Sequence, residues 1–599
     1  MRRNWALKIS PLVAGGVLGV LVACLAAYLL LGNHATANVI AMLAIAALAA
    51  GAVYSGGAVR FLWEDVVVWV GAISLILIGL RAYHQGVLSL AILGVDLEPT
   101  TILGVITCAL ALWAGRVYGG RGYADALLFG ALCFTTLLSV GSLFDWVFEW
   151  SALHTDVSWW VDVGWFAGVA SLISATGLLT IFVRTREGKD GERGRLVLYC
   201  TTLILAGCVW ALWFFSPSLA PLIGAPQPPS EVVPSVQLTY HLATAVAGSS
   251  MSAALFGLGP GSFVQAWNGF RPLGVNRTPL WNVEPEVGHD LLQTGAIEYG
   301  LFWPVLLLTG LVLLGAHAWR HRYRKAGIRV MACVCCTLFA SVTVLPSTSI
   351  FALLVLLLGV TWGEIDSEQE QVRRASSLTL TLIALAVGVL VLFSALLIIM
   401  WYREARVHQT VATAGWSTIE IADYLAREPM TQTALIQPLL LRSQLITTVR
   451  DTAIANGQLA PESVDALVDM ARQGAEYTAQ AYALDQRVST ALLGVEHHLF
   501  RAYGGEARDA NAVINVARTE LFRARFDPRP PYVLATAYYS QEEYDLANQY
   551  IELSLRLKPD FVEALQLREV LTAAMHDTPS LASPAPSEKP VAHSQAVEW

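Results

Sequence analysis

The chain has 599 residues, of which 55% are hydrophobic and only 14% are charged, and its mean hydropathy is +0.54. Soluble domains carry about 25% charged residues, so this composition excludes a soluble globular protein along the whole length. A net charge of -8 and a pI of about 5.9 give no reason to expect nucleic acid as a partner. Residues 10–400 hold long apolar runs, whereas residues 401–577 have the composition of a soluble domain.

The apolar runs predict membrane-spanning helices, because a bilayer core requires about 20 apolar residues in a helix. About eleven segments meet this requirement or come close to it. They are 10–32, 36–54, 64–83, 100–117, 124–144, 162–183, 196–216, 299–319, 329–346, 348–363 and 379–401. The predicted fold class is therefore all-α, with transmembrane helices in 1–216 and 299–401 on either side of a large loop, 217–298.

The distribution of Lys and Arg predicts the direction of these spans. If the N-terminus is cytoplasmic, the inner segments carry eighteen Lys and Arg residues, and the outer segments before the last span carry only three. The positive-inside rule favours this orientation. An odd number of spans then places the large loop and the domain after the last span on the extracytoplasmic side. Arg81 is one of the three outer residues, so we expect it to hold an anion or to reach lipid headgroups.

A turn rich in glycine, FGLGPGSF, follows a helix predicted over 236–255 in the large loop. Gly257, Gly259 and Gly261 permit a tight turn with exposed backbone N–H groups, which suits an anion. The pattern is also typical of a simple loop that ends a helix. It is not a dinucleotide fingerprint, because no strand precedes it and the third glycine is misplaced.

Charged and titratable side chains gather after this turn. They are Arg271, Arg277, Glu284, Glu286, His289, Asp290 and Glu298. Arginine binds phosphate with two parallel hydrogen bonds, and histidine accepts a proton from an attacking hydroxyl near neutral pH. These residue types suit the attack of an acceptor on a sugar whose leaving group is a lipid pyrophosphate. The two glutamates before His289 are also typical of a solvated rim.

Two motifs of this loop resemble the O-antigen ligase/polymerase superfamily. The first is the turn G-x-G-x-x-S/T-F, which is matched by Gly257, Gly259, Ser262 and Phe263. The second is the segment His-Asn-x-x-L-x-x-L-x-E-x-G, which leads into the next span. It is matched by His289, Glu298 and Gly300, whereas Asp290 stands in place of Asn, and Gln293 and Ala296 stand in place of Leu.

The resemblance covers roughly residues 196–365 and implies a glycosyltransferase-C-like helix bundle. It implies transfer of a glycan from undecaprenyl pyrophosphate to a sugar, lipid or protein acceptor, at the outer face of a bacterial cytoplasmic membrane, without metal or cofactor. By that implication His289 is the base that activates the acceptor, and Arg271 or Arg277 holds the pyrophosphate. The other predicted substrate contacts are Arg81, Gly259, Gly261, Ser262, Glu286, Asp290 and Glu298. This mechanism requires the His289 ring and one arginine to converge over a cavity.

Residues 402–577 predict a domain of paired helices. The stretch 534–559 matches one tetratricopeptide (TPR) unit, with small and large residues at the expected positions and Pro559 at its end. One unit does not bury its own face, so the preceding helices must stack on it. The resulting groove suits an acceptor, a partner protein or the chain's own loop. The tail 578–599 is rich in Pro, Ser and Ala and is predicted to be disordered.

The sequence also bears on two other classes of function. A transferase that uses a lipid-phosphate monosaccharide is disfavoured, because the first outer loop is short. A transporter or a non-catalytic scaffold presenting the helical domain is the main alternative, although the spans are almost uncharged and no repeated half is visible. The eight cysteines lie in apolar runs and form no zinc pattern. Cys333, Cys335 and Cys336 suit either a soft metal or simple helix packing.

Overall fold

The computed structural model describes the following parts of the chain, together with a few single residues: 34–54, 63–80, 99–119, 234–278, 287–321, 325–343, 348–368, 383–396 and 507–577. Regular secondary structure in these residues is entirely helical, which confirms the all-α class for the described part. The expected spans 10–32, 124–144 and 162–183, and most of 196–216, lie outside the described residues, so the number of spans stays a prediction.

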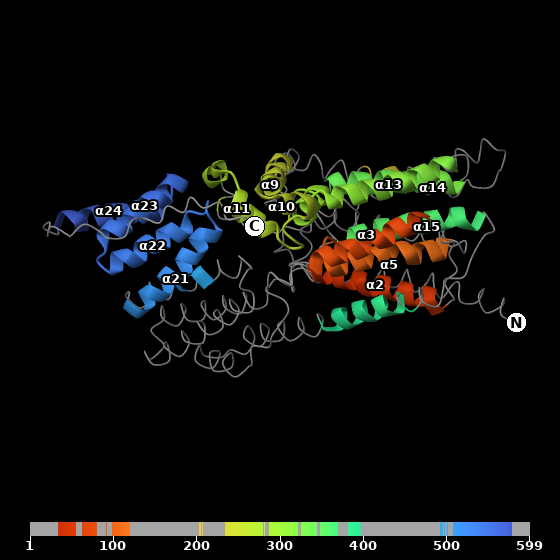
Figure 1. Ribbon diagram of the computed structural model, residues 1–599, viewed down its shortest axis with the longest axis horizontal. Coiled ribbons are helices and arrows are strands. Elements are labelled where there is room, and N and C mark those ends of the chain that lie inside the picture. The colour runs from red at the N-terminus through yellow and green to blue at the C-terminus, as the bar shows by residue number, and fades with distance from the viewer. Residues whose placement is uncertain are drawn as a thin grey trace. The chain divides into compact units, whose positions relative to one another are not determined.

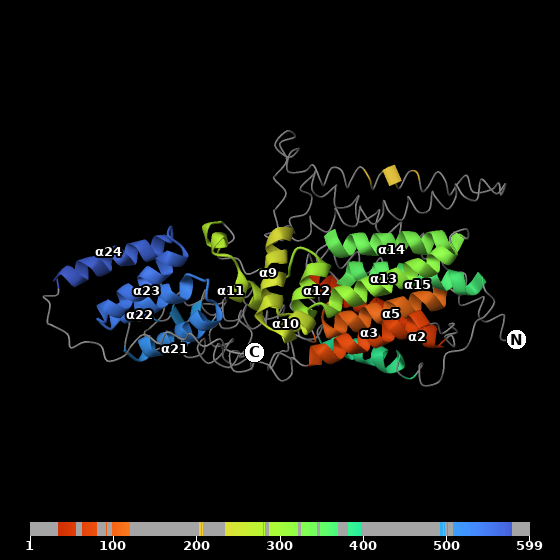
Figure 2. The same cartoon turned by 45° about the horizontal axis from the view of Figure 1, so that its top comes forward.

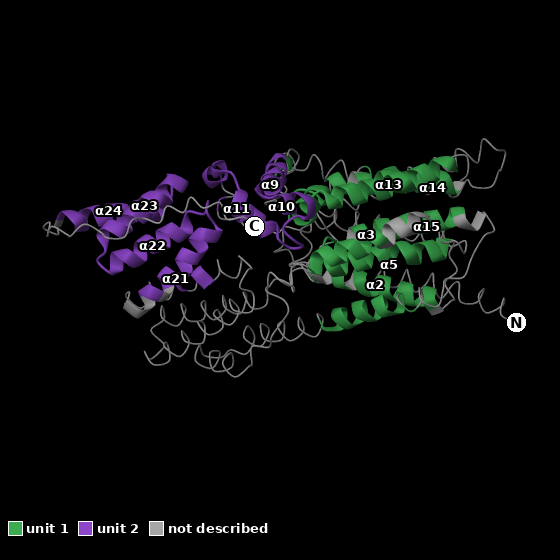
Figure 3. Cartoon of the chain, viewed as in Figure 1, with its two compact units in different colours: residues 1–80, 90–236, 287–399 green, residues 81–89, 237–286, 400–599 purple. Residues whose placement is uncertain are grey.

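The chain divides into two compact units (Figure 3). Unit 1 comprises residues 1–80, 90–236 and 287–399, and unit 2 comprises residues 81–89, 237–286 and 400–599. Most of the large loop therefore belongs with the C-terminal domain, whereas its last part, which carries His289, belongs with the apolar helices.

Six helices of unit 1 run alongside one another in both views (Figure 1 and Figure 2). They are α2 (His34–Tyr54), α3 (Trp63–Leu80), α5 (Ile102–Gly119), α13 (Phe302–Arg320), α14 (Lys325–Thr343) and α15 (Thr348–Glu368). The backbones of α5 and α15 touch where glycines remove the side chain. A Cβ atom on Gly115 or Gly119 would collide with the main chain of α15, and one on Gly359 would collide with α5. Such close approach through small residues is typical of helices packed in a membrane.

Two helices of the described residues, α5 and α13, are long and apolar enough to cross a membrane. Helix α5 is largely buried inside unit 1, whereas α13 is mostly exposed. The exposed side chains of α13 include Val305, Leu308, Val312 and Trp319, which share one helical face. Helix α3 has a similar exposed apolar face. Water-soluble surfaces rarely leave such continuous apolar stripes uncovered, so these faces suit contact with lipid or with another protein.

Polar side chains join α5, α13, α14 and α15 at one end of unit 1. Nη1 of Arg329 donates to both carboxylate oxygens of Glu364, at 3.0 and 2.9 Å. The guanidinium of Arg116 lies 4.0 Å from the centroid of the Trp362 ring. The ring of His317 lies 6.4 Å from the same tryptophan. The four helix ends that the charge distribution assigns to the cytoplasmic side thus lie together.

Unit 2 contains those helices of the large loop that precede residue 287: α9 (Val236–Ser249), α10 (Met251–Phe256), α11 (Phe263–Phe270) and the 3-10 helix η2 (Leu273–Arg277). Its C-terminal part contains α21 (Ala507–Arg523), α22 (Arg529–Ser540), α23 (Tyr544–Leu557) and α24 (Val562–Asp577). Small buried residues such as Ala535 and Ala547 allow α22 and α23 to approach closely. The hydroxyl of Ser554 ties α23 to the start of α22 by donating to the carbonyl of Pro528 at 2.8 Å.

The apolar periodicity of the sequence predicts helices over 529–541, 544–557 and 560–575. These are present as α22, α23 and α24, with small differences at their ends. Their assignment to a TPR repeat stays a prediction. The same periodicity predicts helices over 411–427, 432–456, 461–484 and 486–502, and these ranges lie outside the described residues except for a few single positions.

Candidate functional site

The glycine-rich turn is built by backbone conformations that favour glycine. Gly257, Gly259 and Gly261 have φ angles of 67°, 113° and 70°, a region that side chains disfavour. The N–H of Gly257 ends α10 by donating to the carbonyl of Ala253 at 2.9 Å. Ser262 closes the turn, because its hydroxyl and its N–H both donate to the carbonyl of Gly259. A hydroxyl has a single proton, and the bond to Gly259 uses it. The Ser262 hydroxyl can therefore contact a ligand only as a hydrogen-bond acceptor.

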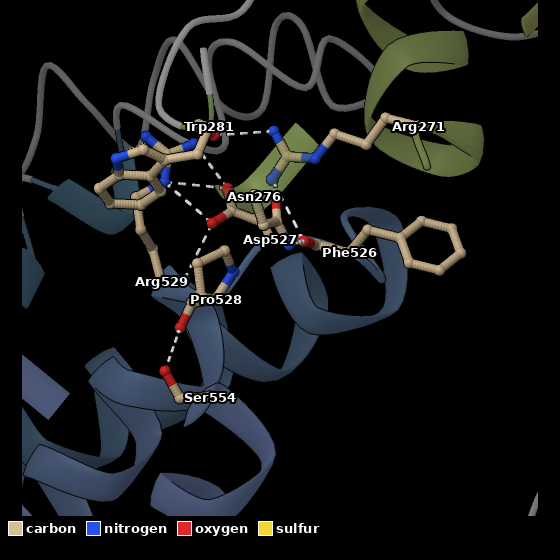
Figure 4. Close-up of polar contacts among 8 residues, drawn as sticks. All are labelled: Arg271, Asn276, Trp281, Phe526, Asp527, Pro528, Arg529 and Ser554. Atoms are coloured by element: carbon tan, nitrogen blue, oxygen red, sulfur yellow. Dashed lines mark hydrogen bonds and ion pairs between the residues drawn. The ribbon is translucent and has the colours of Figure 1, made fainter. Parts of the chain in front are cut away.

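Arg271 follows α11, whose residues Phe263 and Trp267 are buried. Its side chain is itself almost fully buried, with 1% exposed. Nη1 donates to the carbonyl of Trp281 at 3.0 Å, and Nη2 donates to the carbonyl of Phe526 at 3.3 Å (Figure 4). This guanidinium is thus directed at main-chain carbonyls within unit 2. Such surroundings favour a structural role over anion binding.

Arg277 has the opposite character, because it is exposed at the end of η2. The carboxyl group of Asp560 has a lowered pKa, chiefly because the ammonium of Lys558 donates a hydrogen bond to it. The positive charge of Arg277 contributes to the same lowering. Arg277 therefore presents an accessible cation in this part of unit 2, and of the two arginines it is the better suited to a phosphate group.

His289 and Asp290 form a pair at the start of α12 (Leu291–Tyr299) in unit 1. Nδ1 of His289 lies 3.6 Å from Oδ2 of Asp290, and the other carboxylate oxygen caps the helix by accepting from the N–H of Gln293 at 2.7 Å. The imidazole is about one-third exposed, whereas the Asp290 side chain is buried. Burial raises the pKa of Asp290, and the Gln293 hydrogen bond and the nearby His289 oppose that rise.

This geometry explains how Asp290 serves at a position where the resembled motif has Asn. Both residues are good helix N-caps, so the cap of α12 is preserved. The carboxylate also places a negative charge 3.6 Å from Nδ1 of His289, so a proton transfer to this imidazole would create a positive ring beside that charge. A carboxylate behind the ring also stabilises the imidazolium that such a transfer creates.

Helix α12 is capped by local hydrogen bonds at its start and is attached to the segment before α5 at its end. At its start, Thr294 donates to the carbonyl of Asp290 at 2.7 Å and accepts from the N–H of Gly288 at 3.0 Å. At its end, the hydroxyl of Tyr299 donates to the carbonyl of Thr100, just before α5. Glu298 is buried on this helix, with 2% exposed. His289 therefore lies directly before the N-cap of a helix whose far end is attached to the segment before α5.

An apolar cavity of about 200 Å³ lies in unit 1 beside this helix. Its lining comes from α3, α5, α12, α13, α14 and α15 and includes Leu75, Val105, Leu291, Trp303, Leu311 and Phe351. On α13 the lining runs from Trp303 to Leu314, which corresponds to about 16 Å along the helix axis. Leu291 follows the His289–Asp290 pair directly, so the paired residues and the cavity share one helix.

Several expected site residues are not tested by these contacts. Arg81, Glu284 and Glu286 lie outside the described residues. His289 belongs to unit 1, whereas Arg271 and Arg277 belong to unit 2. The expected convergence of the imidazole with an arginine stays a prediction. Within the described part of the chain, no three His, Cys, Asp or Glu side chains gather as a group that could hold a metal ion.

Sequence reasoning missed the residues that join the loop to the C-terminal helices, namely Asn276, Trp281 and Lys558. No sequence signal connects positions so far apart in the chain. The capping role of Asp290 had a visible signal, because an Asp directly before an apolar helical run is a common helix start.

Comparison with protein-family models, with curated proteins and with solved structures finds no match for this chain. The resemblance to O-antigen ligases and polymerases therefore stays a prediction that depends on the two loop motifs.

Proposed function

We propose that this chain is a membrane glycosyltransferase that moves a glycan from a polyprenyl pyrophosphate carrier to an acceptor hydroxyl, as an O-antigen-type ligase or polymerase does. The observation that carries the proposal is the His289–Asp290 pair, separated by 3.6 Å, on the helix that also lines an apolar cavity. A proton acceptor beside an apolar cavity suits a substrate with a reactive polar head and a hydrocarbon tail.

In the proposed reaction, Nε2 of His289 takes the proton of the acceptor hydroxyl. The acceptor oxygen attacks the anomeric carbon of the donor sugar, and a new glycosidic bond forms. The bond between that carbon and the pyrophosphate oxygen breaks, and polyprenyl pyrophosphate leaves with the bonding electrons. Asp290 stabilises the imidazolium, and Arg277 is the arginine that we assign to the pyrophosphate.

The cavity supports the lipid part of this proposal. Its lining is almost entirely aliphatic or aromatic. Binding of a hydrocarbon chain there is favourable, because it removes apolar surface from water or headgroups. It gives a charged or sugar-like group few polar partners. We therefore assign the cavity to the first part of the polyprenyl chain.

The arrangement of helix ends supports an extracytoplasmic reaction. The hydroxyl of Tyr299 donates to the carbonyl of Thr100, two residues before α5, so two helix ends that the charge distribution places outside lie together. The hydrogen-bonded pair of Arg329 and Glu364 joins one end of α14 to one end of α15. The charge distribution places both of these ends on the cytoplasmic side. We propose a cytoplasmic N-terminus, with His289 and the C-terminal domain outside. His289→Cys and Arg320→Cys, each in a chain whose eight native cysteines are replaced, test this by labelling with a membrane-impermeant maleimide in intact cells. Both positions are accessible, because His289 is about one-third exposed and Arg320 is exposed at the end of α13. Reaction at 320 but not at 289 contradicts the proposed orientation.

Gene deletion tests the function in cells. We expect loss of a surface glycan together with build-up of its lipid-linked precursor, both restored by the wild-type gene. Complementation with His289→Ala should leave the precursor accumulated although the protein inserts at a normal level. Unchanged glycan and unchanged precursor after deletion would remove the basis for a ligase or polymerase.

A further inference from the structure

The large loop and the C-terminal helices are joined within unit 2 by a set of buried polar contacts (Figure 4). Residues 271–278 and Trp281 lie against the ends of α21 and α23, and these contacts link positions about 250 to 280 residues apart in sequence. The loop thus depends on a domain that follows the last predicted span.

Asn276 is the centre of this junction. Its side chain is completely buried, and its Nδ2 donates to the carbonyl of Phe526 at 2.7 Å and to the carbonyl of Leu557 at 3.1 Å. Phe526 lies three residues beyond the end of α21, and Leu557 is the last residue of α23, where main-chain carbonyls lack partners within the helix. One amide group therefore joins the segment after α21 to the end of α23, and this contact requires an NH₂ donor at position 276.

Lys558 completes the junction from the other side. Its ammonium donates to the main-chain carbonyl of Asn276 at 2.9 Å and to Asp560 at 3.0 Å. It also lies 5.0 Å from the centroid of the Trp281 ring, within the range of a cation–π contact. Its side chain is only 8% exposed. A buried ammonium group is costly without such partners, so these contacts fix the loop main chain against α23.

Two further contacts broaden the junction. The rings of Trp281 and Phe561 lie 5.4 Å apart, and the buried guanidinium of Arg271 bonds carbonyls on both sides. The end of the C-terminal helical domain that holds Phe526 and Leu557 is therefore covered by the chain's own loop.

We propose that the C-terminal helical domain is a clamp for the large loop, and that Asn276 and Lys558 are positioning residues that fix Arg277. Arg277 follows Asn276 directly, so holding the main chain of residue 276 restricts where the guanidinium of residue 277 reaches. An exposed cation on a fixed main chain binds an anion at a smaller entropic cost than one on a free loop. The catalytic consequence rests on the proposed function, whereas the clamp itself is independent of it.

Limited proteolysis of the full-length chain in lipid vesicles tests the clamp. Trypsin has one favourable site in residues 271–278, after Arg277, because Arg271 precedes a proline. We compare wild type with Asn276→Asp, which replaces the donor by an acceptor, and with Lys558→Met and Lys558→Arg. The matched control is Asn515→Asp, at an exposed position of α21.

We expect Asn276→Asp to speed cleavage after Arg277 by about tenfold or more, since two buried hydrogen bonds are lost. Lys558→Met should act in the same direction, Lys558→Arg should restore part of the protection, and Asn515→Asp should match wild type. In the glycan-transfer assay, Asn276→Asp should raise the KM for the lipid-linked donor, while the protein inserts at the wild-type level.

The outcomes separate the two proposals. Wild-type cleavage rates in both Asn276→Asp and Lys558→Met would overturn the clamp, whatever His289 does. Faster cleavage with an unchanged donor KM would overturn the positioning role. If the wild-type chain transfers no glycan, the proposed function fails, and the cleavage rates still decide whether the clamp exists.

Discussion

Replacing Asp290 by Asn separates the two tasks of this carboxyl group, namely capping α12 and facing the His289 ring. In the wild type, Asp290 accepts a hydrogen bond from the N–H of Gln293 at 2.7 Å. Asn retains a side-chain oxygen that accepts the same hydrogen bond. It removes the negative charge that lies 3.6 Å from Nδ1 of His289. Asp290→Ala removes both the cap and the charge, so the two variants form a matched pair.

The structure gives different magnitudes for the two variants. Loss of an N-cap costs about 1 kcal/mol of stability, so Asp290→Ala should lower the unfolding free energy by about that amount. Asp290→Asn should keep the cap. Both variants should slow glycan transfer, because the imidazolium loses its carboxylate partner. We expect the slowing to be about tenfold to a thousandfold, which is smaller than the effect of removing the base itself.

The same pair gives a pH prediction. Burial raises the pKa of Asp290 above its ordinary value of 3.8, so folding favours the protonated carboxyl. The associated stabilisation is complete below pH 3.8 and is lost as the pH rises through the raised pKa of the folded chain. Wild type should therefore lose stability relative to Asp290→Asn over that window.

Thermal unfolding of the two proteins between pH 3 and pH 7, in the same detergent, measures this difference. A difference in melting temperature that shifts in favour of Asp290→Asn as the pH rises agrees with the reasoning. A difference that shifts in favour of wild type would show that the His289 contact outweighs burial, and it would refute the stated cause of the raised pKa.

Two further substitutions test the bundle and the cavity. Gly115→Ala should lower the unfolding free energy by about 1–3 kcal/mol or more in a chemical-denaturation assay, because the added Cβ meets the carbonyl of Leu356; a neutral effect would contradict the close approach of α5 and α15. Leu307→Trp should fill part of the apolar cavity and raise the KM for the lipid-linked donor. Leu308→Trp, on the exposed face of α13, is its control, and equal KM values for the two variants would remove the cavity from the lipid site.

The sequence predicted those features that depend on local pattern. The helices after Pro528 follow from their apolar periodicity and from the proline that ends α23, and the structure places them within a few residues of the expected bounds. The glycines of the turn were singled out by their spacing, and all three have positive φ angles. These signals are local because backbone conformation and helix capping depend on neighbouring residues.

Features that depend on distant partners were not predicted. Arg271 was selected as an anion site by residue type and loop position, but its burial against Phe526 is set by a contact across 255 residues of chain. The hydrogen bonds from Asn276 to Phe526 and Leu557 could not be predicted either, since the sequence pattern does not distinguish Asn276 from other polar loop residues. The apolar cavity likewise requires the packing of six helices.

The most direct test of the account measures glycan transfer by the purified chain in vesicles that contain a polyprenyl-pyrophosphate-linked glycan and an acceptor. The wild-type chain should release one polyprenyl pyrophosphate for each glycosidic bond formed, and His289→Ala should slow that release by about a hundredfold to ten-thousandfold while inserting normally. Equal rates for wild type and His289→Ala would contradict the assignment of His289 as the base.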